Sequence, residues 1–107
     1  MKYKNPALTP EERAADLLSI MTLEEKVAQI NIFRGVEYSK IPHKLNHCSV
    51  DRNSDVNYEK FEKTVGDRGI GFIHDSYTVP AVFNKFQRYL VEETRLGIPC
   101  IFTGEAL

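Results

Sequence analysis

A chain of 107 residues is long enough for one small domain. Its hydrophobic fraction of 42% and its charged fraction of 27% are those of an ordinary globular protein. A formal net charge of −1 provides no long-range field that would attract nucleic acid or an anionic membrane. The longest apolar run, Ile98 to Phe102, is far shorter than the roughly 20 residues that a membrane span requires. We therefore expect neither nucleic acid nor a membrane as a partner.

The first residues and the cysteines bear on the cellular compartment. Lys2 and Lys4 are followed by polar and charged residues rather than by an apolar core, so no signal peptide is visible. Cys48 lies in a polar segment and Cys100 in an apolar one. This separation argues against a disulfide framework and is typical of free thiols in a reducing compartment. We therefore expect a cytoplasmic protein.

Two consecutive helices are predicted in the first third of the chain. Thr9-Pro10-Glu11-Glu12 combines an N-cap threonine, a proline at the first helical position and a glutamate that can reach back to the cap. Thr22-Leu23-Glu24-Glu25 repeats this capping signature. Apolar residues follow each cap at helical spacing and predict one apolar stripe per helix. In the first helix the stripe consists of Ala14, Leu17, Leu18 and Met21. In the second helix we expect Leu23, Val27 and Ile30 to be buried, and Glu24, Glu25 and Lys26 to face water.

The middle of the chain lacks a regular pattern. Over residues 34–57, glycine, proline, asparagine and serine are scattered among charges, which predicts a loop or an insertion. Unstructured segments of this length are uncommon in small domains and are often functional. A third helix is then predicted to begin near Tyr58, to bury Phe61 and Val65, and to end near Gly66.

The last third of the chain predicts a strand, a helix and a second strand. Gly69–Ile73 and Ile98–Phe102 are short apolar runs, each typical of a buried strand. Between them, Thr78-Val79-Pro80 opens a helix that ends near Leu96-Gly97. Its apolar residues recur at helical spacing, namely Val82, Phe83, Phe86 and Leu90. Strand, helix and strand in this order predict a parallel βαβ unit, so the expected fold class is α/β.

Four segments form a series that is characteristic as a whole. They are Met21–Gln29, Gly69–Ile73, Asn84–Pro99 and Gly104–Leu107. In this order and at this spacing they resemble the N-terminal part of glycoside hydrolase family 3. There they correspond to the "MTLEEK" segment, the first barrel strand, the next helix with its following strand, and the beginning of the "EALHG" segment. The resemblance spans nearly the whole chain except for residues 34–57.

The resemblance implies the N-terminal part of a (β/α)8 TIM-type barrel, which typically needs about 250 residues. Residues 1–107 would then be a partial barrel domain with two leading helices and about two strand units. It also implies a retaining, exo-acting glycosidase that hydrolyses O-glycosidic bonds in β-glucosides, β-xylosides or α-arabinosides, taken from small molecules or oligosaccharides. Such enzymes use two carboxyl groups roughly 5–5.5 Å apart. In the family both lie downstream of "EALHG", so we expect no catalytic residue in this stretch and no activity from it alone.

Three residues are candidates for binding the substrate. The resemblance assigns Glu105 to the acidic position of "EALHG", which binds sugar hydroxyls in the subsite where the bond is cut. Glu105 also follows a predicted strand, at the barrel face where active sites gather, although it could simply begin a loop. His74 and Asp75 follow the other predicted strand at its carboxyl end, so they could line the same pocket or merely begin an exposed loop.

A cluster of metal-ligating residue types falls within residues 34–57. Its members are His43, His47 and Cys48, with Asp51 and Asp55 nearby. If Pro42 began a helical turn, the two histidines would share one face at a spacing that zinc can use. No second paired cluster follows, and the segment is polar. Chance clustering is the preferred interpretation, and we expect no metal and no cofactor.

The sequence also leaves two alternatives to part of a glycosidase. The chain could be a small stand-alone helical interaction module or an inactive gene remnant. The DNA that follows the codon for Leu107 would distinguish these possibilities from part of a glycosidase. A partial barrel has open strand edges, so we expect the remainder of the barrel or another chain to cover them.

Overall fold

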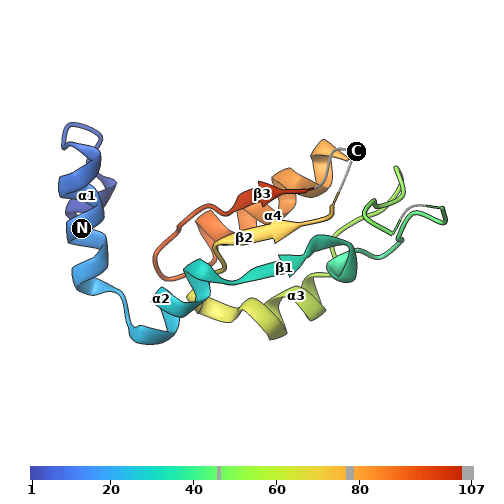
Figure 1. The fold of residues 1–107 in the computed structure, drawn as a ribbon, viewed down its shortest axis with the longest axis horizontal. Helices are drawn as coiled ribbons and strands as arrows, with labels where there is room; N and C mark the ends of the chain where they lie inside the picture. The colour runs from blue at the N-terminus through green and yellow to red at the C-terminus, as the bar shows by residue number, and fades with distance from the viewer. Residues whose placement is uncertain (46, 77–78, 105–107) are drawn as a thin grey trace.

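The structure is a computed structural model and describes residues 1–45, 47–76 and 79–104. Its helices are α1 (Pro10–Ile20), α2 (Leu23–Ile30), α3 (Tyr58–Val65) and α4 (Pro80–Glu92). Its strands are β1 (Ile32–Arg34), β2 (Phe72–His74) and β3 (Ile101–Thr103). The strands of this part of the chain form one parallel sheet in the order β1-β2-β3 (Figure 1). The predicted α/β class is confirmed. Every helix in the described part is too short or too polar to span a bilayer.

Local sequence signals account for the helix boundaries. The Thr9 hydroxyl accepts a hydrogen bond from Glu12 N (3.2 Å), and the Glu12 carboxylate accepts one from Thr9 N (2.9 Å). The second capping box, at α2, has the same form. Asn57 caps α3, and Gly66 ends it with a φ of +56°, a left-handed conformation that glycine adopts without steric cost. The predicted start and end of the third helix are therefore confirmed.

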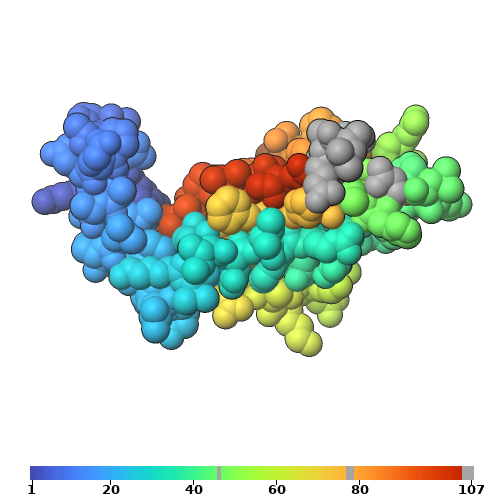
Figure 2. Space-filling model, viewed as in Figure 1, coloured from blue at the N-terminus to red at the C-terminus, as the bar shows by residue number. Residues whose placement is uncertain are grey.

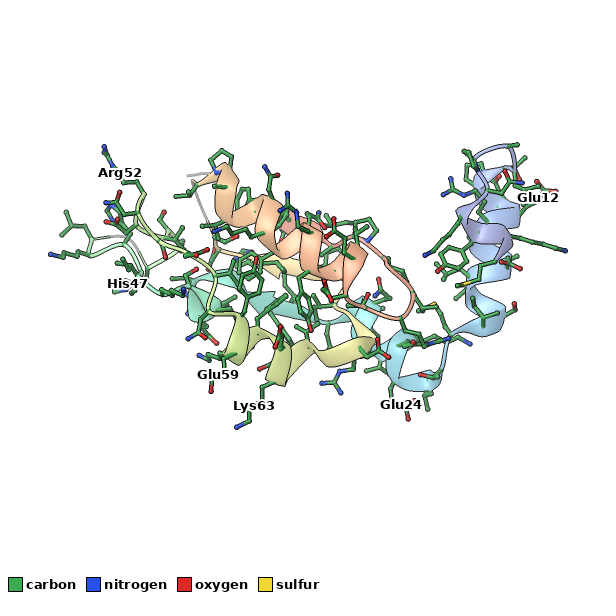
Figure 3. The ribbon with its side chains drawn as sticks, turned by 180° about the vertical axis from the view of Figure 1, so that it is seen from behind. Glu12, Glu24, His47, Arg52, Glu59 and Lys63 are labelled. Atoms are coloured by element: carbon green, nitrogen blue, oxygen red, sulfur yellow. The ribbon has the colours of Figure 1, made fainter. Side chains whose placement is uncertain are left out.

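The sheet has one covered face and one open face. In register, Phe33, Ile73 and Phe102 form the middle row, and this row packs against the core that α3 and α4 build on that side (Figures 1 and 3). Side chains alternate along a strand, so the residues before and after the middle row point to the opposite face. That face carries an apolar row, Ile32, Phe72 and Ile101, and a polar row at the carboxyl ends, Arg34, His74 and Thr103.

Two expectations for the strands need correction. β1 was not predicted, because it has only three residues and its Arg34 was placed in the loop. The run Ile98–Phe102 forms a strand only from Ile101 onward, and it is not fully buried, since the Ile101 side chain on the open face is 59% exposed. The predicted strand Gly69–Ile73 forms only over Phe72–His74, and its Ile73 is buried because the side chain faces the core.

The predicted buried face of α2 is wrong, and so is the predicted exposure of Glu25, whereas Glu24 and Lys26 face water as expected. Leu23 is 72% exposed and Ile30 is 78% exposed, with Val27 also exposed, whereas Glu25 is only 4% exposed. The reason is a partner distant in sequence. Arg95 lies in the turn between α4 and β3. Its Nε and Nη2 donate hydrogen bonds to Glu25 Oε1 and Oε2, both at 2.6 Å. This bidentate ion pair holds the side of α2 that carries Glu25 and the buried Ala28 against the body.

The apolar stripe of α1 also lacks a closed environment. No residue of α1 is fully buried. The helix stands apart from the body across a hollow (Figure 2), into which Leu17 and Ala14 project opposite Ile98. The Tyr3 hydroxyl bridges to the body by donating to the Leu96 carbonyl (2.6 Å). The N-terminal helices are thus attached by a few polar contacts beside an unfilled apolar groove.

The pair between Glu25 and Arg95 predicts a measurable pH effect. Hydrogen bonds from Arg95 hold the pKa of Glu25 below its ordinary value of 4.5. A depressed pKa means that the stabilisation is complete above that ordinary value and is lost as the pH falls through the lowered pKa. Glu25→Gln should therefore destabilise the protein at pH 7 by about 1.5 kcal/mol. This is the lower end for bonds to charged groups, since solvent reaches Arg95.

The measurement is thermal unfolding of both proteins from pH 7 downward, and the difference between the two curves should shrink as the pH falls through the lowered pKa of Glu25. The matched control is Glu12→Gln, which occupies the same capping position on α1 without an arginine partner. It should leave the melting temperature nearly unchanged. A difference between wild type and Glu25→Gln that persists unchanged at the acid end would contradict the ion-pair explanation.

Candidate functional site

The polar row at the carboxyl ends of the strands is the first part of the site. Arg34, His74 and Thr103 occupy one register position on the three strands. His74 Nδ1 lies 3.3 Å from the Thr103 hydroxyl, which joins β2 to β3. The carboxyl edge of parallel strands is where ligands bind in α/β folds. The structure therefore places three hydrogen-bonding side chains at the edge where a ligand is expected.

Asp75 supports this row from beneath. The residue is 4% exposed and has a φ of +51°, a left-handed conformation that is uncommon for a residue with a side chain. Its Oδ2 lies 3.4 Å from Arg34 Nε, and its Oδ1 lies 2.9 Å from His74 Nε2. Its carbonyl accepts a hydrogen bond from Val36 N (2.9 Å). Asp75 thus connects the end of β2 with the end of β1. Such backbone strain persists only where surrounding contacts hold it.

Two buried polar atoms at this edge have no hydrogen-bond partner among the described residues. They are Asp75 Oδ1 and the Ser76 hydroxyl, which follow each other directly after β2. The contact of Asp75 Oδ1 with His74 Nε2 has the distance of an ion pair but not the geometry of a hydrogen bond. Unsatisfied buried polar groups are rare in folded proteins and call for an explanation, which a bound ligand can supply. Hydroxyl groups, which both donate and accept, would satisfy both atoms.

Residues 39–56, which we call the arm, extend from the same edge (Figure 1). The expected loop is an ordered excursion, held by antiparallel bridges between Ser39 and Val56 and between Pro42 and Val50. The two valines are buried in the core. Further backbone hydrogen bonds pair its two sides, such as His43 N to the Ser49 carbonyl (3.0 Å).

Charged contacts attach the arm to the sheet and to α4. Arg34 Nη2 donates to the His47 carbonyl (3.1 Å), so the same side chain contacts Asp75 and the arm. At the other side, Lys85 Nζ on α4 lies 2.6 Å from Asp55 Oδ1. This contact lowers the pKa of Asp55 and raises that of Lys85. The arm is thus held by Lys85 at its base and by Arg34 near its middle.

The candidates from the sequence are distributed as follows. His74 and Asp75 come together at the strand ends, and whether they bind a sugar remains a prediction. Glu105 lies outside the described residues. His43 and His47 are both exposed on the arm, where His43 Nδ1 accepts from Leu45 N (3.2 Å). The described residues contain no group of three or more side chains arranged to hold a metal ion.

Two elements of the site were not predicted from the sequence. Arg34 was placed in a loop, and Thr103 was not singled out.

Cys100, just before β3, is buried, and burial raises the pKa of its thiol to about 12. This keeps the thiol protonated at neutral pH, so it is poorly suited to act as a nucleophile. Its backbone is held by the Gln87 side chain of α4, which fixes the start of β3.

Comparison with known proteins identifies a relative that aligns with most of this chain. No protein-family model matches the sequence. A protein named "Putative beta-xylosidase" from Formosa agariphila is 36% identical over 112 aligned residues, which cover 97% of this chain. The same alignment covers 13% of that relative, so the chain spans only a small part of its length. The chain is therefore a distant homologue of one stretch of that protein.

Proposed function

We propose that this chain is the N-terminal part of a retaining, exo-acting glycosidase that hydrolyses β-xylosides, with β-glucosides and α-arabinosides as the alternatives. The observation that carries the proposal is the polar edge formed by Arg34, His74 and Thr103 with Asp75 beneath it, in a chain whose relative is named a β-xylosidase. In barrels of parallel strands, the residues that contact the substrate lie at this edge.

The role of this stretch in the reaction is to bind the sugar. His74, Asp75 and Ser76 offer a ring nitrogen, a carboxylate oxygen and a hydroxyl within one short segment, a set suited to sugar hydroxyls. Glu105 follows Thr103 by two residues in the chain, and its carboxylate would add charge-assisted hydrogen bonds. The nucleophile and the acid/base would come from a downstream part of a longer polypeptide.

The same polypeptide would cover the surfaces that the chain leaves open. Ile32 and Ile101 are exposed on the open face of the sheet, and β1 and β3 are its edges. In a closed barrel the apolar row would fill the interior, and further strands would pair with the edges. The groove beside α1 would be filled in the same way. We propose the remainder of the barrel as the occupant.

The test compares the chain alone with the longer polypeptide on nitrophenyl β-xyloside. The chain alone should show no turnover above a preparation from cells that carry the empty vector, whereas the longer polypeptide should hydrolyse the substrate. In the latter, Glu105→Gln should lower kcat/KM about 10- to 150-fold, as expected for the loss of a charge-assisted hydrogen bond.

The control for this prediction is Glu92→Gln at the end of α4, where the carboxylate is exposed and lies 4.0 Å from Arg88. It should change kcat/KM by less than about 2-fold. If Glu105→Gln is as harmless as this control in a folded protein, the sugar-binding role is wrong. A reading frame that ends directly after Leu107 would instead favour an interaction module or a gene remnant.

A further inference from the structure

We propose that the arm, residues 39–56, determines selectivity for oligosaccharides over single-sugar glycosides, and that Asp75 is the residue that positions it. This inference rests on the proposed function and adds a second contact region to it. It concerns the part of the substrate that extends beyond the sugar held at the strand ends.

The position of the arm is the first argument. The arm begins five residues after Arg34, the last residue of β1, and lies beyond the carboxyl ends of the strands (Figure 1). A sugar bound at Arg34, His74 and Thr103 would have the arm as its neighbour. A second sugar that continues past this edge would therefore meet the arm. Ordered excursions at this end of parallel strands are where α/β folds place residues that contact substrates.

Several contacts fix the conformation of the arm. Its buried valines, its paired backbone and its attachment to Lys85 hold it in one arrangement. A binding surface that discriminates between ligands must be preorganised, since ordering a loose loop on binding reduces affinity. The exposed side of the arm carries donors for sugar oxygens, including Lys44 and Arg52. Figure 3 shows Arg52 and His47 on the arm, at the end of the molecule opposite Glu12.

Asp75 connects the arm with the proposed sugar site. Its carboxylate contacts His74 and Arg34, and Arg34 in turn donates to the His47 carbonyl of the arm. The left-handed backbone at Asp75 aims the carboxylate back between the two strand ends. One buried carboxylate thus sets the orientation of a side chain in the row and of the arm. Asp75 acts through these residues and is a positioning residue.

The first experiment tests the positioning role by hydrogen exchange on the chain itself. Asp75→Asn keeps the shape, and asparagine tolerates the left-handed conformation, so only the charge is removed. Amides of the arm, such as those of Lys40, His43 and Asp51, should exchange with solvent at least about 10-fold faster. Without the charge of Asp75, Arg34 is no longer held against the arm, so local opening of the arm costs less free energy. Amides of α1 should be unaffected. Uniform acceleration, or none in the arm, would overturn the positioning role.

The second experiment tests selectivity in the longer polypeptide. The double variant Lys44→Ala/Arg52→Ala should lower the ratio of kcat/KM for xylobiose to kcat/KM for nitrophenyl β-xyloside by about 5- to 10-fold, the effect of losing one or two hydrogen bonds. The charge-matched control, Lys26→Ala/Lys63→Ala, lies on α2 and α3 away from the arm and should leave the ratio unchanged (Figure 3).

The possible outcomes separate the two proposals. An unchanged ratio in an enzyme that hydrolyses both substrates would overturn the role of the arm and leave the proposed function intact. An equal fall with the control pair would do the same, because it would trace the effect to net charge. A wild-type polypeptide that hydrolyses neither substrate, and neither nitrophenyl β-glucoside nor nitrophenyl α-arabinoside, would overturn the proposed function and, with it, this inference.

Discussion

Replacing Phe61 with alanine is expected to lower the free energy of unfolding by about 3–5 kcal/mol, the range for large aromatic residues in a closed core. Phe61 is fully buried, with an exposed fraction of 0%. Its ring centroid lies 4.9 Å from that of Phe86, 5.2 Å from that of Tyr89 and 5.6 Å from that of Tyr38. The side chain therefore joins α3, α4 and the turn after β1, and its removal would leave a cavity that none of the three can close alone.

Urea unfolding followed by far-ultraviolet circular dichroism would measure this change. For a domain of this size, a loss of 3 kcal/mol corresponds to a melting temperature lower by roughly 12–24 °C. Tyr58→Ala provides the control, because Tyr58 begins the same helix, is exposed, and has its ring centroid 6.4 Å from that of Tyr89. It should cost less than about 1 kcal/mol. Equal losses for the two variants would mean that Phe61 is not the centre of the core.

The features that sequence analysis predicted correctly are those that depend on neighbouring residues. Both capping boxes need only a threonine and a glutamate three positions later. Helical spacing correctly predicted that Val82, Phe86 and Leu90 of α4 are buried, whereas Phe83 is only half-buried and the buried Tyr89 was missed. The α/β class followed in the same way from the order of strand and helix signals.

The features that were missed depend on partners distant in sequence. Glu25 was expected in water, and only the position of Arg95, 70 residues later, explains its burial. Leu23 and Ile30 are exposed because the described residues leave their face of α2 largely open. A helical pattern identifies an apolar face, but it does not say whether the same segment of polypeptide covers it.

In the candidate site, too, the residues that follow a local pattern were predicted and those that depend on distant partners were missed. His74 and Asp75 could be placed at an edge because they follow a recognisable strand. Arg34 could not, since it reaches Asp75 across 41 positions and only through the pairing of β1 with β2. Thr103 joins His74 across 29 positions in the same manner. The order within the arm depends on Val50 and Val56 entering the core, which no local pattern in that polar segment indicates.

Gly71 is the position where the smallest substitution should have one of the largest effects. It stands where the end of α2 crosses the start of β2, and its N–H donates to the Ala28 carbonyl (3.0 Å). A Cβ at this position would overlap the carbonyl group of Gln29. The obstacle is backbone rather than the end of a flexible side chain, so α2 and β2 would have to separate. We expect Gly71→Ala to cost at least about 3 kcal/mol, the upper end for overpacking.

Gly66→Ala separates this steric effect from the effect of backbone conformation. Gly66 has a φ of +56° and a ψ of −150°, but a Cβ there would meet nothing within 4 Å, so its substitution should cost only the backbone strain of a conformation that is essentially restricted to glycine, about 1–3 kcal/mol. Chemical unfolding of the two variants in parallel gives the comparison. The larger loss should belong to Gly71→Ala, because an alanine at Gly71 cannot be relieved by rotating a side chain. If Gly71→Ala is the milder of the two, the end of α2 does not lie against β2, and the register of β1 beside β2, which places Arg34 next to His74, would have to be revised with it.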